Sequence, residues 1–354
     1  MKVLALNSSP RGEGESKTEM MLTPLINGMR EAGAQVEAVE LREKRIKNCI
    51  GCFTCWTKTP GICVHKDDMT KELFPKWLAS DLVVYATPLY HFTMNASMKA
   101  FVERTLPVAE PFFEHEDGVT RHPLRHKIPP AVVLSVAGFP EDSVFDQLSI
   151  YVNFLFGRSQ NLVAEIYRAA AETMTRIREV NDDVLDATFQ AGKELVTSMK
   201  ISPQTMERIT QPVTDVESFT KLGNMFWKSC IAEGVTPKIF VERELVPRPD
   251  SIDTFMMVFK IGFNTDAAGD LKAVIQFDFS GEQTGSCYFD LADGNLEAND
   301  GAAKTPDLVI ATPFEVWMDI MTGKADGQQM FMEQKYMVSG DIELLMKMGE
   351  LFGR

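Results

Sequence analysis

The sequence predicts a doubly wound parallel α/β domain followed by a separate α+β domain. Up to about residue 200, short apolar runs alternate with helical patterns, which is typical of βα units that share one parallel sheet. From about residue 251, several strands follow one another with helices between them. A chain of 354 residues is long for one core, so two domains are expected. We therefore predict domains at 1–200 and 251–354, joined by a helical linker at 201–250.

The composition excludes several classes of function. Hydrophobic residues make up 45% of the chain and charged residues 24%, as in an ordinary globular protein. The formal net charge of −14 argues against binding to nucleic acid or to an anionic membrane. No signal peptide is visible, and no apolar run approaches the roughly 20 residues of a transmembrane helix. We expect a cytoplasmic protein.

The first βα unit carries a loop that suits a phosphate group. An apolar strand at 3–6 leads into a loop at 7–18, and a helical pattern follows. The loop offers hydroxyls, the guanidinium of Arg11 and the free N–H groups of a helix start. It lacks the glycine spacing of a P-loop and of a dinucleotide-binding loop. Two interpretations remain open at this point, a phosphate site and an ordinary polar turn.

Four further βα units are expected after the first. Their strands are predicted at 36–41, 82–86, 131–136 and 162–167, with helices at 67–79, from 95, up to 156 and at 182–199. A long irregular stretch is expected at 107–129. The loops at 7–18, 87–92 and 137–140 all follow strands, and ligands in this architecture bind at the carboxyl ends of the strands. We therefore expect these three loops to converge on one site.

Four of the six cysteines fall within fifteen residues, namely Cys49, Cys52, Cys55 and Cys63. This spacing indicates a metal or redox site rather than a disulfide framework. Four thiolates without a histidine ligand suit a [4Fe–4S] cluster, because three closely spaced cysteines can surround one cubane and the fourth can reach back to it. A Cys₄ zinc site, metal-free thiols and a redox disulfide are the alternatives. The isolated Cys230 and Cys287 are expected to be packing residues.

The loop after the first strand resembles that of the flavodoxin-like NAD(P)H-dependent FMN reductases, which reads approximately Ser-Pro-Arg with Ser or Thr soon after. The resemblance implies a five-stranded parallel sheet in the order 2-1-3-4-5. It also implies an FMN phosphate site at Ser9, Arg11, Ser16 and Thr18, with Ser8 as a neighbour. Further flavin contacts are implied for a second loop, at Pro88, Leu89, Tyr90, His91, Phe92 and Asn95, and for a third, at Ala137, Gly138 and Phe139. Binding is the expected role of these residues, and no side chain is required as a general acid or base, because FMN carries the hydride chemistry.

The cysteine-rich loop at 49–63 resembles the compact cluster motif of the archaeal and bacterial iron–sulfur flavoproteins. The C-terminal part resembles the sterol carrier protein type-two domain, with strands expected at 273–279, 287–291, 308–311 and 335–339 and helices at 255–263, 313–322 and 341–352. Such domains enclose an apolar tunnel for lipid-like ligands. Nine of the twenty methionines lie in this part, where they suit either a deformable pocket or an ordinary core.

Together these resemblances imply an FMN-dependent oxidoreductase. Electrons from NAD(P)H or from a ferredoxin-like donor would reach a quinone-like or other small acceptor, and the protein would form a homo-oligomer. The alternative is a carrier of hydrophobic ligands or lipids whose flavodoxin-like half is a docking domain. The intact set of Ser9, Arg11, Ser16 and Thr18 favours the enzyme, because a degenerate domain should have lost its phosphate-binding hydroxyls.

Overall fold

The computed structural model describes residues 1–12, 14–157, 160–174 and 178–352. The chain forms two compact units, Met1–Asp215 and Val216–Arg354. The division falls within the expected linker at 201–250. Helix α6 (Pro203–Thr210) belongs to the first unit, whereas α7 (Val216–Glu233) and α8 (Pro237–Glu242) belong to the second. In the described part of the chain, no helix has both the length and the apolar character needed to span a membrane.

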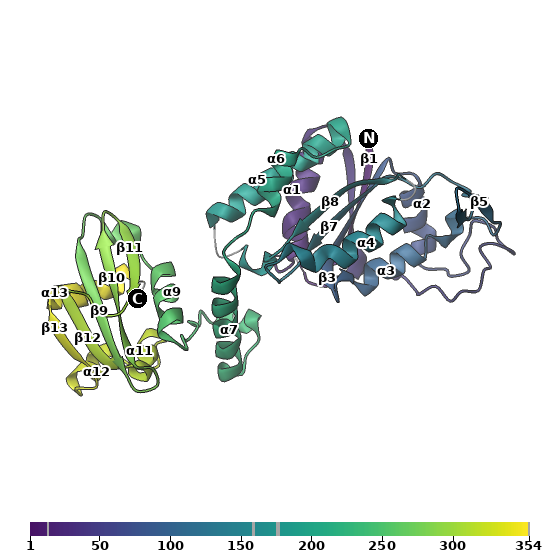
Figure 1. The fold of residues 1–354 in the computed structure, drawn as a ribbon. Coiled ribbons are helices and arrows are strands. Elements are labelled where there is room, and N and C mark those ends of the chain that lie inside the picture. The colour runs from purple at the N-terminus through teal and green to yellow at the C-terminus, as the bar shows by residue number, and fades with distance from the viewer. Residues whose placement is uncertain (13, 158–159, 175–177, 353–354) are drawn as a thin grey trace. The chain divides into compact units, whose positions relative to one another are not determined.

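The first unit, drawn in purple to teal in Figure 1, is built on a parallel sheet in the order β2-β1-β3-β7-β8. These strands are β1 (Lys2–Asn7), β2 (Gln35–Glu40), β3 (Leu82–Tyr90), β7 (Ala131–Val136) and β8 (Leu162–Arg168). Every neighbouring pair among them is parallel. The predicted five-stranded sheet and its 2-1-3-4-5 order are therefore confirmed. A short strand β4 (Thr93–Met94) pairs antiparallel with the end of β3.

Helices cover both faces of this sheet because alternate strand residues point to opposite sides. In β1, Val3 and Ala5 pack in a cluster with α1 (Lys17–Glu31) and α5 (Arg178–Ser198). Leu4 and Leu6 pack on the other face with α2 (Phe74–Leu78), α3 (Ala96–Glu103) and α4 (Asp146–Leu155). The sheet is thus buried on both sides, as its continuous apolar strands predict.

Glycines allow α1 and α5 to cross in close backbone contact. A Cβ atom on Gly28 of α1 would lie 1.9 Å from the carbonyl oxygen of Phe189, and one on Gly192 of α5 would lie 2.1 Å from the carbonyl oxygen of Leu25. Neither position has room for a side chain, because the obstructing atoms belong to backbone.

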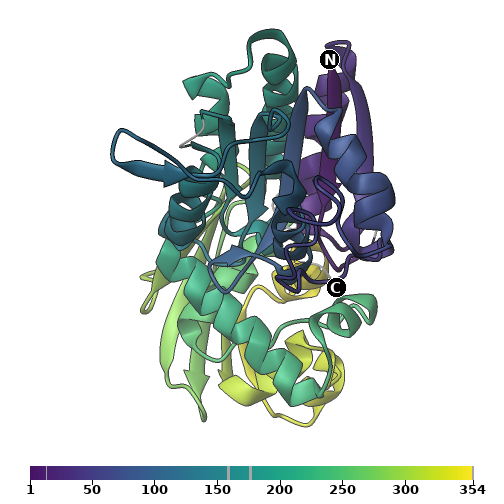
Figure 2. The same cartoon turned by 90° about the vertical axis from the view of Figure 1, so that its right-hand side faces the viewer.

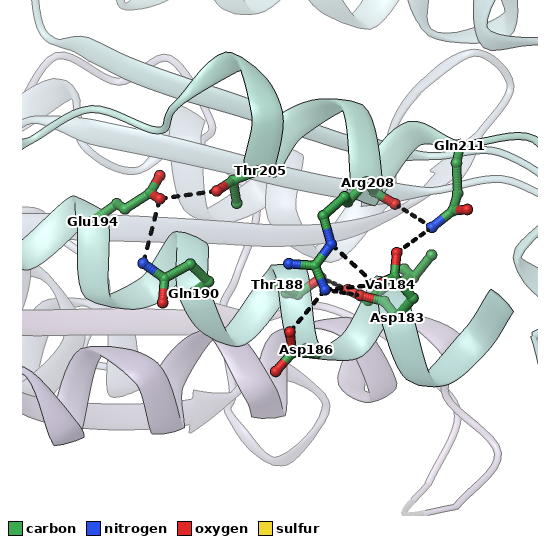
Figure 3. A network of polar contacts seen from close by, with 9 residues as sticks. All are labelled: Asp183, Val184, Asp186, Thr188, Gln190, Glu194, Thr205, Arg208 and Gln211. Atoms are coloured by element: carbon green, nitrogen blue, oxygen red, sulfur yellow. Dashed lines mark hydrogen bonds and ion pairs between the residues drawn. The ribbon is translucent and has the colours of Figure 1, made fainter. Parts of the chain in front are cut away.

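A polar network fixes α6 on α5 (Figure 3). Arg208 of α6 donates to Asp183 at 2.6 Å and to Asp186 at 2.8 Å. Gln211 Nε2 also donates to Asp183, at 2.6 Å, and Thr205 donates to Glu194 at 2.9 Å (Figure 3). The segment 201–215 is therefore an integral part of the first unit.

Two expected elements differ from the structure. The helix predicted at 67–79 is instead a π-helical turn at Met69–Leu73 followed by α2. Pro75 lies in the first turn of α2 and lacks the N–H that would continue a regular α-helix from the preceding turn. The stretch at 107–129, expected to be irregular, contains a hairpin of β5 (Glu114–Glu116) and β6 (Val119–Arg121), which projects from the first unit in Figure 2. Asp117 and Gly118 both have positive φ, as a tight hairpin turn requires.

The second unit is an α+β domain on a mixed sheet in the order β11-β10-β9-β12-β13. Its strands are β9 (Ala273–Ser280), β10 (Gly285–Ala292), β11 (Asn295–Asp300), β12 (Leu308–Pro313) and β13 (Met337–Gly340), and its helices include α9 (Ile252–Ile261), α10 (Thr265–Ala268), α11 (Phe314–Met321), α12 (Gly327–Met332) and α13 (Ile342–Leu351). β12 runs parallel to β9, and the other pairs are antiparallel. Phe255 and Phe259 of α9 pack against Phe277 and Phe289 of the sheet in one aromatic core. Helix α9 begins before the predicted residue 255, because Ser251 and Thr254 form a capping box.

Candidate functional site

The loop after β1 is held in a fixed curve by its own polar groups. The backbone N–H of Ser8 donates to the carbonyl of Ala86 at 2.9 Å, and its hydroxyl donates to the same oxygen at 3.1 Å. The N–H of Ser9 donates to Oδ1 of Asn7 at 3.0 Å, and the N–H of Arg11 donates to the Ser9 hydroxyl at 3.3 Å. Asn7, Ser8 and Ser9 are all buried. Sequence reasoning missed Asn7, whose side chain shapes the start of this loop.

The same loop ends at the N-terminus of α1. The hydroxyl of Ser16 caps the helix by accepting the N–H of Glu19 at 3.1 Å. A hydroxyl in this role still has its own proton to donate to an anion. Thr18 is buried in the first turn. Ser16 and Thr18 thus lie at the positive end of a fifteen-residue helix, where a negative charge is stabilised.

The second loop is a tight two-residue turn between β3 and β4. Tyr90 pairs with Thr93, so His91 and Phe92 form the turn itself. Both have positive φ, at 47° and 63°, although neither is glycine. Such strained residues concentrate at functional sites. Tyr90 is 45% exposed and Phe92 is 49% exposed, so two aromatic side chains are presented at the end of β3, whereas Pro88 before them is buried and Leu89 is partly buried.

Asn95 joins the first two loops. Its Nδ2 donates to the carbonyl of Ser8 at 2.6 Å, and its backbone N–H donates to the Thr87 hydroxyl at 3.1 Å. Its Oδ1 accepts the N–H of Met98 at 3.1 Å and so caps α3. Asn95 is buried, and both Nδ2 and Oδ1 of its side-chain amide are hydrogen-bonded to backbone. It therefore supports the loops from beneath.

The third loop follows β7 and lies against the loop after β8. The N–H of Ala171 donates to the carbonyl of Ala137 at 2.8 Å, and the N–H of Ala170 donates to that of Phe139 at 2.6 Å. The ring of Phe139 is exposed and stacks on Phe92 of the second loop, with centroids 6.3 Å apart. The structure therefore brings all three predicted loops together at the carboxyl ends of the strands.

Arg11 reaches across this site to an acidic residue that sequence reasoning missed. Its Nη1 atom lies 2.7 Å from a carboxylate oxygen of Glu172, and Gly138 of the third loop is adjacent to Glu172. The hydrogen bond to Glu172 is the main cause that raises the pKa of Arg11, and nearby Tyr90 adds to it. Glu172 lies just after β8, and its position at a strand's carboxyl end is the signal that could have identified it.

The four clustered cysteines line one cavity. Cys55 is buried, and burial together with the neighbouring sulfurs of Cys63, Cys52 and Cys49 raises the pKa of its thiol. Cys52 is exposed, and hydrogen bonds from Thr54 lower the pKa of its thiol. All six cysteines are free. Within the described residues, no three His, Cys, Asp or Glu side chains are already arranged around a metal position.

A buried ion pair lies beneath the cysteine loop, and sequence reasoning missed it too. Arg104 of the segment after α3 makes a bidentate contact with Asp67, at 2.8 and 3.0 Å, and both side chains are almost completely buried. Arg104 also donates to the carbonyl of Lys47 at 2.6 Å and to the hydroxyl of Thr70 at 3.0 Å. The thiol of Cys63 lies beside the guanidinium. The pair therefore fixes the start and the end of the cysteine loop to the segment that follows α3.

Two family matches agree with the division of the chain. Residues 1–153 match the NADPH-dependent FMN reductase family, and residues 264–353 match the SCP-2 sterol transfer family.

Individual relatives match part of the chain. An iron-sulfur flavoprotein of Archaeoglobus fulgidus is 38% identical over 107 residues, so that the match spans 30% of this chain and about half, 46%, of the relative. An iron-sulfur flavoprotein of Methanocaldococcus jannaschii is 26% identical over 208 residues, which are 57% of this chain and 98% of the relative. The azoreductase from Bacillus anthracis str. Sterne is similar with a TM-score of 0.42 and 13% identity, covering 55% of this chain and 98% of that structure.

Proposed function

We propose that this protein is an FMN-dependent oxidoreductase. The premise is that the chain belongs to the NADPH-dependent FMN reductase family through residues 1–153 and carries a domain of the SCP-2 sterol transfer family at 264–353. Electrons from NAD(P)H would pass to a small acceptor of the quinone class. The observation that carries the proposal is the convergence of Arg11, the Ser9 and Ser16 hydroxyls and three exposed aromatic rings at the carboxyl ends of the strands.

The residues of this site suit the two halves of FMN. Hydroxyls, a guanidinium and a helix N-terminus suit the phosphate, for which we assign Ser9, Arg11, Ser16 and Thr18 with Ser8 as a support. Tyr90, Phe92 and Phe139 offer ring faces and edges for the flavin, and the backbone around His91, Ala137 and Gly138 borders them. FMN when bound supplies the hydride and electron chemistry. The protein side chains bind it, orient it and shield one side of it from water.

A titration with two flavins tests the phosphate assignment. FMN and riboflavin differ only in the phosphate, so Arg11→Ala should weaken FMN binding about tenfold to a hundredfold, as expected for a lost charge-assisted hydrogen bond. Riboflavin binding should stay within about twofold. Quenching of flavin fluorescence measures both dissociation constants. If Arg11→Ala leaves FMN binding unchanged, or if the wild type binds neither flavin, the proposal is wrong.

We further propose that Cys49, Cys52, Cys55 and Cys63 hold a [4Fe–4S] cluster. The four cysteines line one cavity, and relatives named iron-sulfur flavoproteins match part of the chain. Four thiolates carry excess negative charge, and the guanidinium of Arg104, although already paired with Asp67, lies beside Cys63 and would stabilise that thiolate by a hydrogen bond. Protein purified without oxygen should contain about four irons and four sulfides per chain. Zinc in their place, or no metal at all, would contradict the cluster.

The source of the electrons depends on these cysteines. With a cluster, a ferredoxin-like partner could deliver single electrons, whereas direct hydride transfer from NAD(P)H needs no cluster. Mixing the oxidised protein with NADH, with NADPH or with reduced ferredoxin under anaerobic conditions, and following flavin bleaching, separates these donors.

The match to the SCP-2 family favours one additional function, the binding of an apolar ligand by the second unit. The acceptor of the reductase or an unrelated lipid could be this ligand. A fluorescent fatty acid should bind to the full chain without displacing FMN if the second unit holds it. Displacement of FMN by the fatty acid would contradict a separate lipid site.

A further inference from the structure

The carboxyl end of β2 carries an acidic residue to which the proposed flavin site gives no role. Glu40 is the last residue of β2, and its register partner is Asn7, the last residue of β1. The parallel pairing therefore places Glu40 beside the start of the loop at 7–18. The Oε2 atom of its carboxylate is buried. A buried carboxylate close to a site assigned to an anion is unfavourable by itself, so a compensating role is expected.

One contact of Glu40 orients the side-chain amide of Asn7. Nδ2 of Asn7 donates to Oε1 of Glu40 at 3.1 Å, and Oδ1 of the same amide accepts the N–H of Ser9 at 3.0 Å. Since an amide has one donor end and one acceptor end, an acceptor at Nδ2 turns Oδ1 toward Ser9. Asn7 is buried, so bulk water cannot take the place of the carboxylate. Glu40 thus fixes the backbone of Ser9 through Asn7.

A second contact of Glu40 holds Arg42 against a later part of the same loop. Nη1 of Arg42 lies 2.5 Å from Oε2 of Glu40 and donates to the carbonyl oxygen of Arg11 at 3.0 Å. Burial is the main cause that raises the pKa of Glu40, and the contacts with Asn7 and Arg42 oppose it. The same two groups therefore stabilise the charged form of Glu40 and connect it to the loop.

The two links end on residues that we assign to the FMN phosphate. One reaches the N–H of Ser9, and the other reaches the carbonyl of Arg11. Ser8 is held differently, because its N–H donates to the backbone of Ala86. A loop that already has its bound conformation loses less conformational entropy when the ligand arrives, and this tightens binding.

We propose that Glu40 is a positioning residue for the FMN phosphate. Its link through Asn7 holds Ser9. Its link through Arg42 holds Arg11. The inference rests on the proposed FMN site for its functional meaning, but the links themselves can be tested without flavin. If Glu40 acted only through its charge, removing it would strengthen the binding of an anionic phosphate, whereas a positioning role gives the opposite sign.

Amide hydrogen exchange of the full-length protein with flavin removed tests the links alone. In Glu40→Ala, the amide of Ser9 should exchange about tenfold faster than in the wild type, and the amide of Ser8 should stay within about twofold. Glu40→Gln keeps an acceptor oxygen for Asn7 and should restore the Ser9 rate to within about threefold of the wild type. Unchanged exchange of Ser9 in Glu40→Ala, or equally fast exchange in both variants, would overturn the proposal.

Flavin titrations test the consequence for binding. Glu40→Ala should weaken FMN binding about tenfold and leave riboflavin, which has no phosphate, within about twofold. Glu37→Ala is the matched control, since Glu37 lies on the same strand but pairs with Lys76 instead of a group of the loop. This control should leave both affinities within about twofold of the wild type. FMN binding that is unchanged or tighter in Glu40→Ala would refute the positioning role.

The outcomes separate this inference from the proposed function. If the wild type binds neither flavin, the proposed function is wrong, whatever the exchange rates are. If the wild type binds FMN and Glu40→Ala weakens both flavins equally, the proposed function stands and the positioning role is refuted. If Glu40→Ala does not fold, Arg42→Ala decides through its link to Arg11. FMN binding should then weaken several-fold with riboflavin unchanged, and unchanged FMN binding would refute the proposal.

Discussion

The carboxylate of Glu172 pairs with the guanidinium of Arg11, the group that we assign to the FMN phosphate. The Arg11–Glu172 contact of 2.7 Å joins the first loop to the segment after β8, and both side chains are about half exposed. A phosphate on Arg11 would meet the negative charge of Glu172 at the same place, so the ion pair and the flavin compete.

Glu172→Gln should therefore tighten FMN binding several-fold, because the variant removes both the competing ion pair and a repulsive charge. Riboflavin, which has no phosphate, should bind as it does to the wild type. Titrations of the two flavins at low and high salt measure the effect, which should shrink as salt screens the charges. Weaker FMN binding by Glu172→Gln would show instead that the carboxylate is needed to position Arg11.

Asp67 and Arg104 form the most deeply buried ion pair described in the first unit. Removing one partner of such a pair leaves an uncompensated charge, which typically lowers stability by about 3–5 kcal/mol. Asp67→Asn should therefore lower the free energy of unfolding by an amount of this order. Asp186→Asn, which alters the exposed contact to Arg208, should change it by less than about 1 kcal/mol. Urea unfolding measures both, and equal effects of the two substitutions would contradict the argument.

The same carboxylate should give the protein a distinct acid sensitivity. Burial opposes the charged form of Asp67, but hydrogen bonds from Arg104 and from the amides of Lys47 and Thr70 outweigh it and hold the pKa of this carboxyl well below its usual range. The unfolded chain, with a pKa of about 3.9, then takes up the proton first, so this contribution is complete above about pH 5 and is lost as the pH falls below 4. Unfolding free energies at pH 6, 4 and 3 should fall less steeply in Asp67→Asn than in the wild type. Parallel curves would show that other groups govern the acid response.

At the scale of elements, the sequence was sufficient for the sheet but not for the contacts between distant residues. The apolar runs predicted the strands, and the loops that follow three of them were expected at one edge of the sheet. The order of the strands was predicted from the family resemblance of the polar loop at 7–18. The pairs Arg11–Glu172 and Asp67–Arg104 could not be predicted, because no local pattern links residues 161 or 37 positions apart. The π-helical turn at Met69–Leu73 also has no periodic signature that distinguishes it from an α-helix.

The crossing of α1 and α5 is set by two glycines whose role is visible only in three dimensions. Gly28→Ala should destabilise the first unit by about 2 kcal/mol or more, because the new Cβ would overlap a backbone carbonyl that has little room to move. Gly223→Ala is the matched control, since this helical glycine of α7 has open space around it and should gain up to about 1 kcal/mol from higher helix propensity. Thermal unfolding followed by circular dichroism compares the two. A neutral Gly28→Ala would show that the helices can separate freely.

For the whole molecule, the position at which the first unit ends, Asp215, determines which fragment of the chain can fold alone. Each unit has its own hydrophobic core, and the Arg11, Tyr90 and Glu172 side chains all belong to the first. The buried Arg168 of β8 donates to the carbonyl of Ile209 in α6 and to that of Gln211 just after it, so a boundary at residue 200 would remove both of these partners.

We therefore expect a fragment of residues 1–215 to fold and to bind FMN within about twofold of the full chain, as an independent domain should. A fragment of residues 1–200 should be clearly less stable, since it lacks the buried Ile209 and the polar contacts of Arg208 as well. Chemical unfolding and FMN titration of both fragments beside the full chain give the answer. FMN binding that is tenfold weaker in a folded 1–215 fragment would mean that the second unit contributes to the flavin site. Equal stability of the two fragments would mean that α6 is dispensable to the first unit.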